Sequence, residues 1–159
     1  MLITIAAVGR LKAGPERELF DRFTARVDAA GRKLGLTITV REFAESRAGS
    51  ATARKQEEAA AILAALAARG PIVALDEAGK ALASPVFADK IARWRDDGAS
   101  DIVFAIGGAD GHGPALLDKA ILRLAFGQMT WPHQLVRVML AEQLYRAVTI
   151  LAGHPYHRD

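Results

Sequence analysis

A glycine-rich stretch, IGGADGHGP at residues 106–114, is the first part of the sequence whose composition suggests binding chemistry. It directly follows the apolar run DIVFAI, so it would form the loop that leaves the carboxyl end of a buried strand. Gly107 and Gly108 permit positive φ values and a close approach of the backbone, so a phosphate or a flat nucleoside could lie against main-chain groups. A tight turn that binds nothing is the alternative that a pair of glycines leaves open.

The C-terminal third of the chain holds the side chains suited to acid–base chemistry. All four histidines lie there, beside several arginines. The candidates for proton transfer are His133, His154, Tyr156 and His157, and the candidates for holding an anion are Arg137 and Arg146. Because isolated histidines in a tail are more often solvated than metal-bound, we expect no metal site.

Several catalytic classes are excluded or disfavoured by what the sequence lacks. The absence of cysteine excludes disulfides, thiolate zinc sites and cysteine nucleophiles. The chain has no G-x-x-x-x-G-K-[ST] loop, and IGGADG lacks the G-x-G-x-x-G spacing, so ATP hydrolysis and hydride transfer are disfavoured. No serine stands in a G-x-S-x-G elbow, which disfavours a serine hydrolase.

The elements that must position these residues alternate between strands and helices. Strands are predicted at 2–8, 36–43, 71–76, 101–106 and 120–126, the last of which could instead continue a helix. Helices are predicted at 15–34, 54–70, 84–98, from 114 and at 133–152, with Ser84 as an N-cap and surface loops at 44–53 and 76–83. This order predicts an α/β fold with a mostly parallel sheet and helices on both faces.

Length and composition agree with one domain over residues 1–159. The chain is 51% hydrophobic and 25% charged, enough for a single core. A net charge of +3 and a sequence pI near 9.5 suit a polyanionic partner. The N-terminal apolar segment is too short for a membrane span and lacks the features of a signal peptide, so we expect a cytoplasmic protein without membrane contact.

Three predicted loops would meet at the carboxyl edge of the sheet, at Asp76, Gly107 and Gly127, where open α/β sheets bind ligands. The last helix is apolar on two faces, which predicts burial on both, and a partner subunit could cover the second. The residues alone therefore predict an α/β domain that binds a small nucleoside-like ligand, with an anionic partner as a further possibility.

Three long blocks of the sequence resemble a known family. They are LDEAGKALASPVFA (75–88), FAIGGADGHGP (104–114) and MTWPHQLVRVMLAEQLYRAVTILAGHPYH (129–157). Their order and spacing are similar to those of the RlmH (YbeA) family, the SPOUT-class methyltransferases of large-subunit ribosomal RNA. The resemblance extends from AAVGRLK near the start to PYH at the end, and the loop at 44–52 matches least.

The resemblance implies a SPOUT-type C-terminal trefoil knot, a homodimer and S-adenosylmethionine as the cofactor. The positions that match the family's cofactor contacts are Leu75, Gly107, Phe126, Gly127, Gln128, Met129, Thr130 and Trp131. The family often has serine where this chain has Gly127 and lysine or leucine-like residues near Gln128. Contacts through main-chain atoms would survive these differences.

The resemblance also implies the reaction, methylation at N3 of a pseudouridine in a hairpin loop of 23S ribosomal RNA within the assembled ribosome. We expect Tyr156 and His157 to be catalytic and to reach the partner's cofactor site, and Arg137, Arg146 and His154 to bind substrate. A structural ion pair, with Glu142 as the partner, is the alternative for Arg137. A non-catalytic ribosome-binding module and a SPOUT methyltransferase with another RNA target are the alternative functions.

Overall fold

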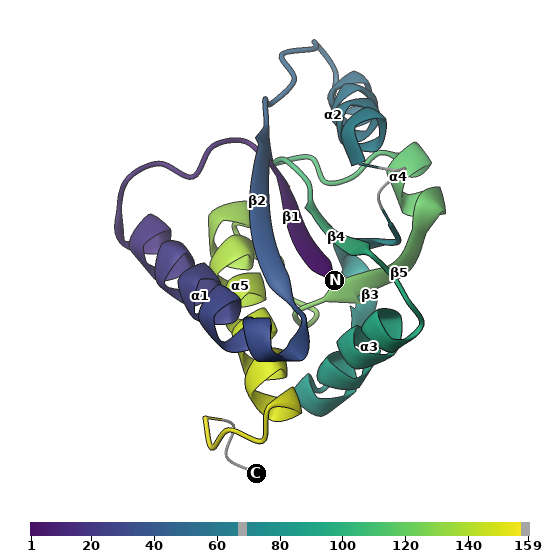
Figure 1. Ribbon diagram of the computed structural model, residues 1–159. Helices are drawn as coiled ribbons and strands as arrows, with labels where there is room; N and C mark the ends of the chain where they lie inside the picture. Colours follow the sequence, from purple (N-terminus) through teal and green to yellow (C-terminus); the bar gives the residue numbers. More distant parts are fainter. Residues whose placement is uncertain (67–69, 157–159) are drawn as a thin grey trace.

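The computed structural model describes residues 1–66 and 70–156, and its centre is a five-stranded parallel sheet in the order β2-β1-β4-β3-β5 (Figure 1). The strands are β1 (Leu2–Val8), β2 (Thr37–Phe43), β3 (Ile72–Ala81), β4 (Asp101–Ile106) and β5 (Ala120–Ala125). The helices are α1 (Pro15–Gly31), which a 3₁₀ turn at Arg32–Leu34 follows, α2 (Ala51–Leu66), α3 (Ser84–Asp96), α4 (Pro114–Lys119) and α5 (His133–Leu151).

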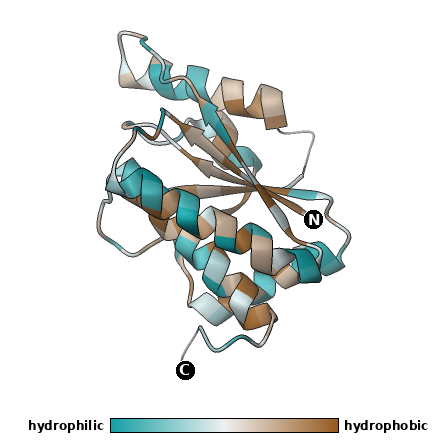
Figure 2. Cartoon of the chain, turned by 60° about the vertical axis from the view of Figure 1, so that its left-hand side comes forward, coloured by the Kyte–Doolittle hydropathy of each residue, from teal (hydrophilic) through white to brown (hydrophobic). Residues whose placement is uncertain are grey.

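The sheet is covered by helices on both faces, as Figure 2 shows. Successive side chains of a strand point to opposite faces, so each buried strand supplies two cores. In β1, Ile3 and Ile5 belong to the core shared with α1, α3 and α5, whereas Ala6 and Val8 belong to the core shared with α2 and α4. The predicted α/β class, with a parallel sheet between two helix layers, is confirmed.

The second half of β3 corrects the loop predicted at 76–83. β3 continues to Ala81, and after an irregularity between Leu75 and Lys80 it pairs again with β5. Its exposed, small and polar residues resemble a loop in sequence, although the backbone remains paired. Gly79 permits this pairing, because a Cβ there would lie 2.6 Å from the carbonyl carbon of Arg123. The strand predicted at 120–126 is confirmed as β5, and the alternative of a continued helix is wrong.

The structure places a serine N-cap at Ser50 of α2 and not at Ser84 of α3. The expected N-cap Ser84 is the first residue of α3, after an extended Ala83, and its hydroxyl donates to Oε1 of Gln143 at 2.8 Å. By contrast, Ser50 accepts a hydrogen bond from the backbone N–H of Ala53 at 3.2 Å, which is the geometry of a cap. The helix α2 therefore begins at residue 51, inside the predicted loop 44–53.

The long helix α5 packs against both α1 and α3 on one face of the sheet. Its buried stripe consists of Leu140, Ala141, Leu144, Ala147 and Val148. Other apolar residues on the helix are only partly buried, and Leu135 is 38% exposed, so the burial of a second face by a partner subunit stays a prediction. The trefoil knot stays a prediction drawn from the resemblance.

Candidate functional site

The three predicted loops enclose a cavity of about 470 Å³. Its wall combines the irregularity of β3 at Leu75–Glu77, the glycine-rich segment 106–112 after β4, and the segment that joins β5 to α5. Of the eight residues expected to contact a cofactor, seven line this cavity: Leu75, Gly107, Phe126, Gly127, Met129, Thr130 and Trp131. Gln128 does not line it. The volume lies within the usual range for small-molecule sites.

Close contacts leave little room for a side chain at either glycine of the pair 107–108. A Cβ on Gly107 would lie 2.9 Å from the carbonyl carbon of Gly111, and one on Gly108 would lie 2.9 Å from Oε2 of Glu58. Gly108 and Gly111 also form an isolated antiparallel bridge. The tight turn that the sequence left open as an alternative is therefore present, and it forms part of the cavity wall.

Side chains from two elements hold this glycine loop in place. Arg54 of α2 bonds both carboxylate oxygens of Asp110, at 2.7 and 3.1 Å. The ring of His112 is buried and its Nε2 lies 3.2 Å from the carbonyl oxygen of Ala105. Burial lowers the pKa of His112 below its ordinary value, so the ring is neutral and donates to that carbonyl.

The third loop is fixed by a glycine conformation and one side-chain bond. Gly127 has a φ of +109°, which disfavours the serine common in the family at this position. The hydroxyl of Thr130 donates to Oε2 of Glu77 at 2.6 Å, across the cavity wall. On either side of Thr130, the side chains of Met129 and Trp131 are exposed, by 71% and 40% respectively.

Charged and titratable residues that were not among the predicted cofactor contacts also line the cavity. They are Lys55, Asp76, Glu77, Asp110, His112 and His133. The loop ends at residues 76 and 107 indicated the region, and His133 stood among the acid–base candidates. Lys55 gave no signal in the sequence, because its position depends on how α2 packs over the glycine loop, whereas Asp110 belongs to the glycine-rich stretch itself.

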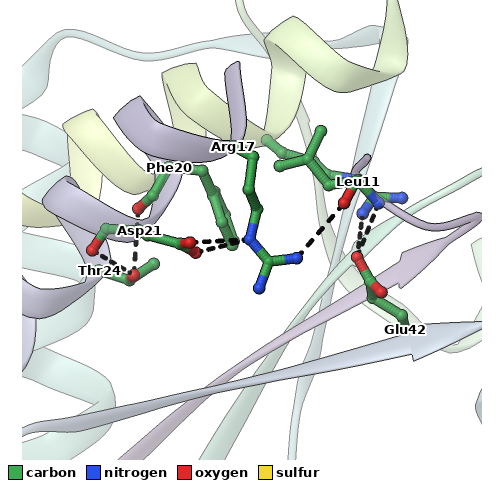
Figure 3. A network of polar contacts seen from close by, with 7 residues as sticks. Leu11, Arg17, Phe20, Asp21, Thr24 and Glu42 are labelled. Atoms are coloured by element: carbon green, nitrogen blue, oxygen red, sulfur yellow. Dashed lines mark hydrogen bonds and ion pairs between the residues drawn. The ribbon is translucent and has the colours of Figure 1, made fainter. Parts of the chain in front are cut away.

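The structure gives Arg137 an internal position instead of one facing a substrate. Only 1% of its side chain is exposed. Its guanidinium donates to the carbonyl oxygens of Val8 and Gly9, at 2.6 and 2.9 Å, and to Oε1 of Glu42 at 3.0 Å. The same Glu42 oxygen accepts the backbone N–H of Leu11 at 2.8 Å, beside the Arg17–Asp21 pair (Figure 3). This geometry fits the alternative of a structural ion pair, with Glu42 in place of Glu142.

The expected catalytic tail lies at the other end of α5. The hydroxyl of Tyr156 donates to Oε1 of Glu142 at 3.2 Å, and its ring packs on Tyr145 with 4.6 Å between centroids. Arg146 bonds Glu142 at 2.6 Å and lies over the Tyr156 ring at 5.2 Å. Burial and Glu142 raise the pKa of Tyr156, so its phenol stays protonated. His154 is exposed, and His157 lies outside the described residues.

The cavity lies at the start of α5, whereas the tail leaves the end of the helix and folds back along it. α5 begins beside the cavity at His133 and ends at Leu151, and 19 residues of α-helix span about 28 Å. Figure 1 shows the C-terminal tail at the end of α5 away from the loop that precedes the helix. Tyr156 folds back to Glu142, about half-way along α5, and does not line the cavity of its own chain.

Within 1–66 and 70–156, no group of three or more histidine or acidic side chains is arranged to hold a metal ion. In the same part of the chain, no helix combines the length and apolar character needed to cross a membrane.

Comparison with known proteins identifies the family. A family described as "Predicted SPOUT methyltransferase" matches residues 1–157. The chain belongs to this SPOUT methyltransferase family. Among similar proteins, those named "Ribosomal RNA large subunit methyltransferase H" from Bradyrhizobium diazoefficiens and Nitrobacter hamburgensis are 60% and 58% identical, with 99% of each chain covered. The resemblance that the three sequence blocks predict is thereby confirmed.

A solved structure supports the fold of this SPOUT methyltransferase independently. A probable methylase family protein from Haemophilus influenzae superposes with a TM-score of 0.54 at 11% identity, covering 99% of this chain and 70% of that one. At this identity the likeness concerns the fold alone. Membership of a methyltransferase family agrees with S-adenosylmethionine as the cofactor that the sequence predicts.

Proposed function

We propose that the protein transfers a methyl group from S-adenosylmethionine to N3 of a pseudouridine in a hairpin loop of 23S ribosomal RNA, within the assembled ribosome. The observation that supports this most directly is the cavity, which gathers Leu75, Gly107 and most of the segment 126–131. Relatives that are 56–60% identical over the whole chain are named as large-subunit ribosomal RNA methyltransferases. A ribosomal substrate implies that the protein acts in the cytoplasm.

The cavity has the character that a nucleoside cofactor requires. S-adenosylmethionine supplies a methyl group already activated by its sulfonium. Main-chain groups of residues 126–131 would hold the edge of the adenine, and the glycine loop would form another part of the wall around the cofactor. Acidic side chains at Asp76 and Glu77 give the wall negative charge that suits the cationic parts of the cofactor. The protein's task is then to align N3 with the methyl carbon and to exclude competing water.

A complete active site requires two copies of the chain arranged as a homodimer. Tyr156 does not line the cavity of its own chain, and its hydroxyl is bonded to Glu142 in the middle of α5, so it contributes to catalysis by entering the cavity of the partner. Its raised pKa makes the phenol a hydrogen-bond donor, which can stabilise the anion left when the N3 imide loses its proton. His157 is the neighbouring candidate for taking up that proton, and Arg146 and His154 are candidates for contacting RNA.

Calorimetric titration with S-adenosylmethionine tests the cofactor assignment. Ala109 is exposed at the cavity wall, so Ala109→Trp should block the cavity without disturbing the core. Ala60 is exposed on α2 and does not line the cavity, so Ala60→Trp is the matched control. We expect binding by the wild type and by Ala60→Trp, and none by Ala109→Trp.

Methyl transfer to undermethylated ribosomes tests the reaction and its target. Mapping the methyl group to N3 of a pseudouridine in the 23S hairpin loop would support the full proposal. Transfer to another nucleotide would instead support a SPOUT methyltransferase with a different RNA target. A protein that binds ribosomes, but neither binds the cofactor nor transfers methyl groups in their presence, would be a non-catalytic ribosome-binding module.

A further inference from the structure

Two exposed apolar side chains stand at the cavity. Six large hydrophobic residues are notably exposed within residues 1–66 and 70–156: Val40, Val86, Ile121, Met129, Trp131 and Leu135. Of these six, Met129 and Trp131 line the cavity. An exposed aromatic side chain beside polar groups is suited to binding a ligand that has a flat, apolar face.

The backbone around Trp131 is fixed from both sides. Thr130 is bonded to Glu77 at 2.6 Å, and Pro132 is the N-cap of α5. A residue that precedes proline is restricted to extended conformations, which further limits the backbone of Trp131. The indole therefore projects from a segment with little freedom to lose on binding, which favours its use as a preformed contact surface.

We propose that Trp131, with Met129 beside it, is a stacking platform for the unpaired RNA base that receives the methyl group. This inference rests on the proposed function and names a substrate-positioning residue within it. The acceptor atom must reach the methyl carbon inside the cavity, so the base must lie at the cavity mouth, where Trp131 is exposed. Proteins commonly hold bases of single-stranded RNA loops by stacking them on aromatic side chains.

The surroundings of Trp131 favour a nucleobase over a second protein chain as the occupant. Lys55, Asp76, Glu77 and Asp110 line the same cavity. A base presents an apolar face together with hydrogen-bonding edges, which suits one aromatic ring among charged groups. The core of an interface between identical subunits is usually depleted of charged residues.

Three substitutions separate stacking from simple apolar packing. Trp131→Phe keeps an aromatic face, Trp131→Leu keeps apolar volume without one, and Trp131→Ala removes both. We expect Trp131→Leu and Trp131→Ala to lower kcat/KM for undermethylated ribosomes by about 10- to 100-fold, the range expected from losing one stacked base. Trp131→Phe should stay within about threefold of the wild type. Val86→Ala, at an exposed site on α3 outside the cavity, is the matched control.

Two parallel measurements distinguish the possible failures. All variants should bind S-adenosylmethionine within about twofold of the wild type and sediment like it, because the cofactor contacts expected at residues 129 and 131 are made by main-chain atoms that these substitutions leave in place. Full activity of Trp131→Leu, loss of cofactor affinity, or dissociation into monomers would each overturn the inference. Wild-type protein that binds the cofactor without methylating ribosomes would instead overturn the proposed function, and the platform with it.

Discussion

At the scale of single residues, Arg137 is a buried charge whose partners come from separate segments of the chain. Glu42 lies 95 residues away in sequence, and the Val8 and Gly9 carbonyls lie 129 and 128 residues away. Its guanidinium thereby ties α5 to the ends of β1 and β2. The helical pattern of the sequence could not reveal these partners. It shows neither which side chain of α5 meets Glu42 and the two carbonyl groups nor that a cation is buried in the protein interior.

Replacing Arg137 should reduce stability severely. Arg137→Ala would leave two carbonyl oxygens without this donor and Glu42 with only the Leu11 N–H, and breaking a buried pair in this way typically costs about 3–5 kcal/mol. Urea unfolding measures the loss. Arg32→Ala is the control, because Arg32 forms an exposed pair with Asp28, and such pairs contribute at most about 1 kcal/mol. Equal effects of the two substitutions would show that Arg137 is not a structural cation.

His112 should make stability depend on pH in the mildly acidic range. Burial lowers the pKa of the folded ring below its ordinary value of 6.5, so the unfolded chain takes up a proton before the folded one does. The contribution of His112 to the free energy of unfolding is fully present above pH 6.5, and it declines as the pH falls toward the pKa of the ring in the folded protein. Unfolding free energies at pH 7.5 and 5.5 should therefore differ more for the wild type than for His112→Asn; an unchanged difference would contradict this.

At the scale of secondary-structure elements, the sequence predicted the five strands and the helices that separate them, because buried strands and capped helices leave strong local patterns. It missed the second half of β3, where exposed residues continue to pair with β5. It also assigned the cap of α3 to Ser84, one residue inside the helix. Both errors concern contacts with distant segments, β5 and Gln143, that local composition does not record.

Gly79 should be essential to this second half of β3. Its φ is ordinary for any residue, but a Cβ would collide with the backbone of Arg123 and Leu124 in β5. Because backbone cannot yield as a side chain does, we expect Gly79→Ala to destabilise the protein by about 1–3 kcal/mol. Gly49→Ala is the control, since nothing lies within 4 Å of its Cβ position. Thermal unfolding compares the two, and similar melting temperatures would refute the close approach.

At the scale of the whole molecule, the separation of cavity and tail has a direct test by mixing subunits. Ala109→Trp blocks the cofactor cavity and Tyr156→Ala removes the phenol of the tail, so the methyl-transfer activity of each homodimer should be impaired. A heterodimer contains one intact cavity facing one intact tail. Random exchange at equal concentrations should therefore restore about a quarter of the wild-type sites. Methyl-transfer assays before and after exchange measure this, and no recovery would indicate that each tail serves its own cavity.

The region of the cavity was predictable from the strand ends at Asp76, Gly107 and Gly127, whereas the individual cofactor positions were drawn from the resemblance. The knot, the dimer and the tail's role came from the resemblance, since periodicity describes neither threading nor a second chain. The distance between Tyr156 and the cavity could be known only once α5 was placed against α1 and α3.

The position of α5 in the core also determines when this protein can fold during its own synthesis. Leu140, Leu144 and Val148 complete the larger of the two cores, against residues of α1 and β1 that are made first. A nascent chain emerging from the ribosome must therefore keep that apolar surface uncovered until residue 148 has left the tunnel. The central pairing of β1 with β4 likewise waits for residues 101–106. The protein that is proposed to modify ribosomes is thus expected to complete its larger core only once α5 has emerged from one.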